Sequence, residues 1–124
     1  MKKFDPQIYP RKLYVFESEW DLKLFTTREG LELEAERDTV ASVWRVVEKG
    51  SEELGVAVWF QRVGLDSIAH ESDHIANCIF NDLGIDLGYE HDEHHAYMIG
   101  WIAKCIGEGL GLTIVKEERN ERKD

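Results

Sequence analysis

The chain of 124 residues is long enough for one domain with a sizeable core and too short for two. Its hydrophobic fraction of 43% is that of an ordinary globular protein. The 25 acidic residues outnumber the 15 Lys and Arg, so the formal net charge is −10 and argues against nucleic acid or an anionic membrane as the main partner. We expect a single domain over residues 1–115 and a charged, disordered tail over 116–124.

The beginning of the chain lacks the pattern of a secretion signal, because its basic start meets Asp5 and Pro6 instead of an apolar segment. No apolar run approaches the roughly 18 residues that a membrane span requires. The two cysteines, Cys78 and Cys105, lie in apolar runs, which favours buried thiols over a disulfide. These features predict a cytoplasmic protein without a membrane anchor.

The first half of the chain predicts strands with one short helix. Residues 1–10, which contain two prolines, are expected to be irregular, and the β-rich residues 12–17 predict a strand. A short helix follows, with Trp20 and Leu24 on a common face that can extend to Phe25. The polar residues 26–38 predict either a solvated loop or a marginal edge strand.

Two Val-rich segments, residues 39–48 and 53–63, are the clearest strands of the sequence. A short turn that contains Gly50 joins them, so we expect an antiparallel hairpin. From Asp66 the apolar period becomes helical, and Gly84 marks the end of this helix. Its apolar stripe consists of Ile68, Ala69, Ile75, Ala76, Ile79, Phe80 and Leu83.

A second helix is predicted after a short connection, and it should stop near Gly107 or Gly109. Small or apolar residues suited to packing recur along it: Ala96, Ile99, Gly100 and Ala103. Residues 110–115 are expected to add a last short strand. The predicted fold is an α+β domain, in which a twisted antiparallel sheet of three or four strands packs on the two helices.

The first of these helices carries the sequence HESDH, residues 70–74. His70 and His74 share one face, so their ring nitrogens can approach one metal ion at the roughly 2.0–2.1 Å that zinc requires. Glu71 stands beside them, where it can take a proton from water. The pattern predicts a Zn²⁺ site with its general base; the alternative is two histidines on a solvated face of an acidic helix.

A catalytic zinc ion needs a third protein ligand. Glu93 is the leading candidate, because it lies in the first turn of the second helix, 19 residues after His74, and faces the same side as Tyr97. The alternatives are His91, His94 and His95. Asp92 and Glu93 can interact favourably with the helix dipole, which explains these two acids without a metal. It does not explain the three histidines beside them.

Together, residues 70–74 and the sequence DEHHAY, residues 92–97, resemble the zincin metallopeptidases of the gluzincin type. The chain is also similar, over about residues 9–105, to small zincin-like proteins encoded by phages and prophages of gut Bacteroides. This resemblance implies that His70, His74 and Glu93 bind zinc and that Glu71 is the general base.

The same resemblance implies that the strand containing Val56, Val58 and Phe60 lies beside the active helix, and that a peptide or protein substrate pairs with a strand edge. Tyr97 is a candidate for transition-state stabilisation, with a core position beside Trp101 as the alternative.

The hypothesis from sequence is therefore a zinc-dependent peptidase-like protein. One rival is a non-catalytic zinc-binding module, in which a further histidine closes the open coordination position. Another is a metal-free acidic interaction protein of a phage or mobile element. Asp73 either orients a ligand imidazole or is simply exposed, and Asn77 and Asn81 either line the cleft or are solvated.

Overall fold

The computed structural model of the chain describes residues 1–29, 41–47, 54–85 and 92–113. The expected tail and His91 lie outside these residues, as does most of the segment predicted to be a loop or an edge strand. Of the expected last strand, residues 110–113 are described, and they form a turn and no strand. None of the helices in the described ranges is long and apolar enough to cross a membrane.

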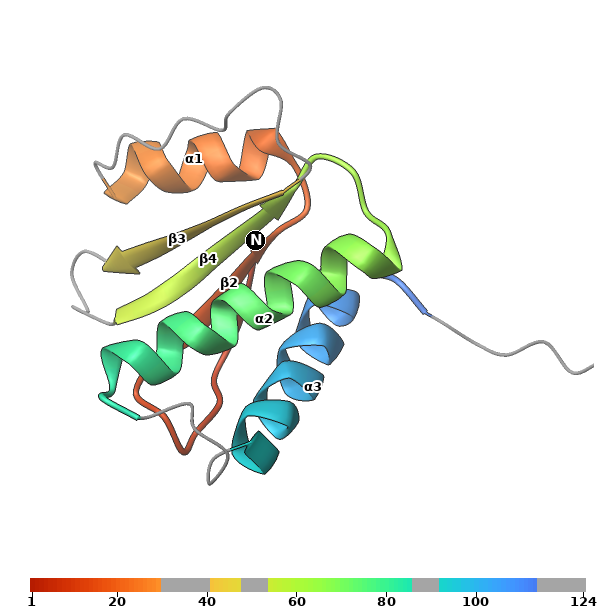
Figure 1. Cartoon of the computed structure of the whole chain (residues 1–124). Helices are drawn as coiled ribbons and strands as arrows, with labels where there is room; N and C mark the ends of the chain where they lie inside the picture. Colours follow the sequence, from red (N-terminus) through yellow and green to blue (C-terminus); the bar gives the residue numbers. More distant parts are fainter. Residues whose placement is uncertain (30–40, 48–53, 86–91, 114–124) are drawn as a thin grey trace, which may run out of the picture.

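Four strands form one sheet in the order β1-β2-β4-β3 (Figure 1). They are β1 (Lys2–Phe4), β2 (Lys12–Phe16), β3 (Ala41–Val47) and β4 (Leu54–Phe60). The β3–β4 hairpin and the β1–β2 pair are antiparallel, whereas β2 and β4 run parallel, with Tyr14 opposite Ala57. The predicted hairpin is confirmed, but the sheet is mixed and not wholly antiparallel, because the hairpin joins β2 through its second strand.

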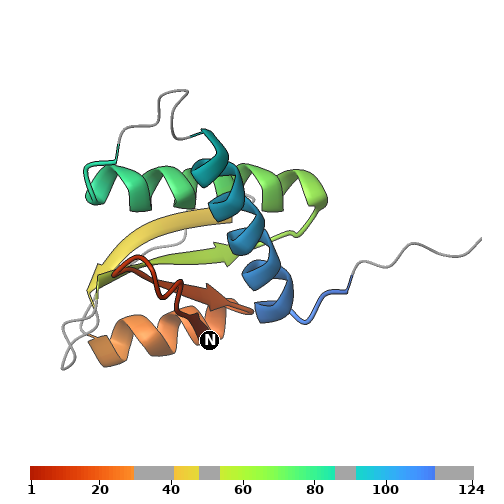
Figure 2. The ribbon, with the colours of Figure 1, turned by 90° about the horizontal axis from the view of Figure 1, so that it is seen from below.

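Helices cover both faces of the sheet (Figure 2). α1 (Glu19–Glu29) covers one face, and the pair α2 (Leu65–Asp82) and α3 (Asp92–Gly109) covers the other. Strand residues alternate between these layers: on β2, Leu13 and Val15 join the α2–α3 core, and Tyr14 and Phe16 join the α1 core. The α+β class is confirmed.

The N-terminal segment and α1 differ from the prediction. Residues 2–4 are strand β1, because the two prolines lie beyond it in the connection to β2. On α1, Trp20 and Leu24 are 67% and 51% exposed, whereas Phe25, at the margin of the predicted face, is buried together with Leu22. The Phe25 ring packs against the rings of Tyr14 and Phe16, at 5.6 and 5.2 Å between centroids, which decides the buried face.

The two helices of the second layer begin and end close to the predicted positions. The apolar stripe of α2 is buried except for exposed Ala69 and half-buried Leu83, and Gly84 follows the helix with φ +70°, a conformation that favours glycine. On α3 the predicted packing face is shifted, because Ala96 and Gly100 are exposed. The buried residues of α3 are Met98, Ile102, Cys105 and Ile106.

Both cysteines are free thiols, as predicted. Cys78 is only half-buried, whereas Cys105 is buried among the α2–α3 core residues. Burial raises the pKa of the Cys105 thiol to about 12, so this sulfur stays protonated at neutral pH.

Ser72 is fully buried on α2, and its Oγ atom has no hydrogen-bond partner among the described residues. A buried hydroxyl without a partner costs about 1–3 kcal/mol, and the alanine side chain has nearly the same shape. We therefore expect Ser72→Ala to raise the free energy of unfolding by roughly 1 kcal/mol, measured by urea denaturation.

Ser67→Ala provides the matched control for this prediction. The Ser67 hydroxyl accepts a hydrogen bond from the Gly64 N–H at 2.9 Å and donates one to the Gly64 carbonyl at 3.0 Å. Its removal should lower the free energy of unfolding by about 0.5–2 kcal/mol. A loss of stability in Ser72→Ala as large as that in Ser67→Ala would show that the Ser72 hydroxyl is satisfied.

Candidate metal centre

His70 and His74 lie one turn apart on the solvent-exposed side of α2. Their Nε2 atoms are 3.0 Å apart, and their rings meet edge to face with centroids 4.6 Å apart. Both side chains therefore direct the same ring nitrogen toward one point, as the spacing of the two histidines predicts.

The distance between these nitrogens can be compared with the requirement of a zinc ion. Two nitrogen ligands at 2.0–2.1 Å in tetrahedral positions lie about 3.3 Å apart. The observed 3.0 Å differs from this by a few tenths of an ångström, which small side-chain rotations supply. His70 and His74 thus fit two adjacent positions of one zinc ion, with a third ligand still required.

Glu71 is half-buried and lies about 100° around α2 from His70. Asp82, three turns further on this side of the helix, accepts a hydrogen bond from the Arg45 Nε atom of β3 at 3.0 Å. Helix geometry therefore puts Glu71 on the side of α2 that contacts β3 at Asp82.

The resemblance to zincins implied that β4, with Val56, Val58 and Phe60, lies beside the active helix, and these side chains do pack with residues of α2. The substrate-pairing edge that the resemblance also implied cannot belong to β4. β4 lies between β2 and β3, so both of its edges already form hydrogen bonds within the sheet. These three side chains are buried in the α2–α3 core. Among the described strands, the one that combines an outer edge with proximity to α2 is β3.

A second polar cluster connects α2 to α3. His95 Nε2 lies 2.8 Å from Asn77 Oδ1 and 3.4 Å from Asp73 Oδ1, and the Asn77 amide donates to Asp73 Oδ2 at 3.3 Å. The His95 ring also packs against Phe80, with 5.9 Å between the ring centroids. His95 is therefore the α3 side chain that contacts α2 next to His74, and Asn77 belongs to the contact between the two helices.

Glu93 is exposed and lies about 200° around α3 from His95, on the side turned away from α2. Within the described ranges, no group of three or more His, Cys, Asp or Glu side chains is arranged to hold a metal ion. The structure therefore brings His70 and His74 together, and of the described candidates it brings neither Glu93 nor His94 nor His95 into a metal-holding group with them.

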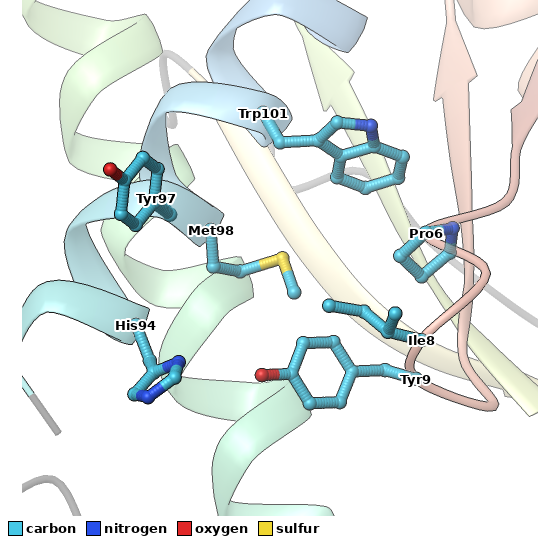
Figure 3. Close-up of a pocket in the computed structure, with 7 residues that line it drawn as sticks. All are labelled: Pro6, Ile8, Tyr9, His94, Tyr97, Met98 and Trp101. Carbon is cyan, nitrogen blue, oxygen red and sulfur yellow. The ribbon is translucent and has the colours of Figure 1, made fainter.

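Tyr97 and His94 also lie away from the histidine pair. Tyr97 is 74% exposed, so it is not the core residue of the alternative interpretation. Both side chains line a hollow on the other side of α3, together with residues of the β1–β2 connection (Figure 3).

Sequence reasoning missed the contact of His95 with Asp73 and Asn77. Asp73 and Asn77 are four residues apart, and this spacing was the available signal for a shared face. The partner of that face depends on how α3 crosses α2, for which the sequence has no pattern.

Comparison with known proteins adds no relative: no protein-family model, curated protein or solved structure matches this chain. The chemistry of the site is therefore argued from its own geometry. That geometry consists of two convergent imidazoles, an adjacent carboxylate, and a neighbouring edge strand.

Proposed function

We propose that this protein is a zinc-dependent, peptidase-like hydrolase. His70 and His74 would hold the metal, and Glu71 would act as the general base. The observation that carries the proposal is the convergence of the His70 and His74 Nε2 atoms, at 3.0 Å, on the helix that also presents Glu71. The separation of 3.0 Å is also that of a direct hydrogen bond between the two rings, which holds both Nε2 atoms on the same side of α2.

Zinc, when bound, supplies a Lewis acid that makes water a nucleophile near neutral pH. The Glu71 carboxylate accepts the proton of the attacking water and returns it to the leaving amine of the cleaved peptide bond. Its half-buried position beside β3 keeps this carboxylate next to a substrate bound along that strand.

The substrate of the proposed reaction is an extended peptide or protein segment. β3 is the last strand of the sheet among the described residues, so its outer edge pairs with none of the other three described strands. A peptide can add to such an edge through main-chain hydrogen bonds, and this would place its backbone beside Glu71. A catalytic metal with one open position completes this arrangement.

Two residues compete for the role of third ligand. The resemblance to gluzincins favours Glu93, whereas the orientation of the side chains favours His95, because His95 contacts Asp73 and Asn77 on α2 and Glu93 faces away. Binding through His95 would yield a set of three histidines, which occurs in catalytic zinc sites.

The proposal is tested by zinc affinity, measured by competition with a chromogenic chelator on the full chain. We expect one zinc ion per chain, and a loss of affinity of at least about 100-fold in His70→Ala and in His74→Ala, since each removes a direct ligand. His95→Ala and Glu93→Gln separate the two favoured third ligands, and His94→Ala tests the remaining described candidate. Glu19→Gln, on α1, is the control.

No zinc binding by the wild-type chain would refute the proposal and leave the metal-free interaction protein. Zinc lost to the same extent in Glu19→Gln as in His70→Ala would show that binding is unspecific. Tight zinc binding by His70 and His74, without hydrolysis of any member of a broad peptide library, would establish the non-catalytic zinc module instead.

A further inference from the structure

A hollow of about 370 Å³ lies on the side of α3 that faces the β1–β2 connection, away from the histidine pair (Figure 3). It is lined by Pro6, Ile8 and Tyr9 from the connection and by His94, Tyr97 and Trp101 from α3. Buried Met98 lies between these two sets of side chains. The hollow therefore combines three aromatic rings with aliphatic and sulfur groups.

Large apolar side chains at the rim of this hollow are exposed to solvent. Ile8 is 79% exposed and Tyr97 is 74% exposed. Phe80 holds the Tyr9 ring in place, because the two rings pack edge to face with 5.5 Å between their centroids. Aromatic and Met side chains around a preformed depression are typical of binding surfaces, where Tyr and Trp contribute much of the affinity.

The chemistry of the hollow favours a cationic ligand. Glu93 is exposed and lies one helical turn before Tyr97, which in turn lies one turn before Trp101, so a carboxylate stands on the same side of α3 as the two aromatic rings. Aromatic faces attract Lys and Arg side chains. No Lys or Arg is among the described residues that line the hollow, and the net charge of the chain is −10.

We propose that this hollow binds a basic peptide segment of a partner protein. An apolar side chain of the segment inserts between Tyr9 and Met98, and a neighbouring Arg or Lys lies on the Tyr97 and Trp101 rings with Glu93 as its counter-ion. This site is separate from the proposed metal centre, and it assigns Glu93 to partner binding rather than to zinc.

The test uses two blocked peptides, one of three Arg-Leu-Pro repeats and one of three Glu-Leu-Pro repeats, titrated into the full chain by calorimetry. They share their apolar content and differ in charge. We expect the Arg peptide to bind at least about tenfold more tightly than the Glu peptide. Tyr97→Ala should weaken binding of the Arg peptide about tenfold, and Glu93→Gln should weaken it and flatten its salt dependence.

Trp20→Ala is the matched control, because Trp20 is an aromatic residue of similar exposure, 67%, on α1 at the opposite face of the sheet. Equal binding of both peptides, equal losses in Trp20→Ala and Tyr97→Ala, or no binding of the Arg peptide would each overturn the proposal. Zinc affinity lost in Glu93→Gln would return this residue to the metal centre, whereas zinc affinity unchanged in Tyr97→Ala agrees with two separate sites.

Discussion

Glu71→Gln is expected to lower the rate of peptide hydrolysis by about 10²–10⁴-fold while zinc affinity stays close to that of the wild type. The amide keeps the size of the side chain and loses the basic oxygen that accepts the proton of water. The rate is measured under single-turnover conditions with zinc-loaded protein and a fluorogenic peptide from the library that the wild type cleaves.

Glu19→Gln serves as the control for this loss, because Glu19 is an exposed acid that pairs with Lys23 on α1, at the opposite face of the sheet. It should hydrolyse the peptide at the wild-type rate. Full activity in Glu71→Gln would exclude Glu71 as the base. A parallel loss of zinc would instead indicate that the carboxylate is a ligand.

Phe80→Ala is expected to lower the free energy of unfolding by about 3–5 kcal/mol, the largest effect on stability that we predict. Phe80 is fully buried on α2, and its ring contacts the rings of Tyr9 and His95, so it joins α2 to both the β1–β2 connection and α3. The alanine leaves a cavity that the three elements cannot close together. Urea denaturation followed by far-UV circular dichroism measures the change.

Trp20→Ala is the control of similar chemistry at an exposed position and should change the free energy of unfolding by no more than about 0.5 kcal/mol. If Phe80→Ala were as mild as Trp20→Ala, α2, α3 and the β1–β2 connection would not share one core. If Phe80→Ala disturbed only the contact of its ring with His95, zinc affinity would fall while the urea midpoint stayed unchanged.

The sequence alone determined the elements whose pattern is local. The β3–β4 hairpin follows from two Val-rich segments around a glycine turn, and α2 follows from apolar residues that recur on one helical face. The approach of His70 to His74 was predictable for the same reason, since four residues along a helix return to the same side.

Only the tertiary structure decided which surfaces meet. α1 has apolar residues around most of its circumference, so its sequence does not decide which of them are buried. Packing on Tyr14 and Phe16 buries Leu22 and Phe25 and leaves Trp20 and Leu24 exposed. The parallel pairing of β2 with β4 likewise depends on where the hairpin docks, which involves contacts between residues more than 40 positions apart.

The candidate site likewise has one part that the sequence predicts and another that only the tertiary structure decides. HESDH predicted two candidate ligands and a candidate base, and their relative positions were predictable because all three lie on one helix. The contribution of α3 depends on its rotation about its own axis, and this rotation turns His95 toward Asp73 and Asn77 and leaves Glu93 beside Tyr97. A rotation of one helix against another is determined by the whole buried interface, and no short stretch of sequence encodes it.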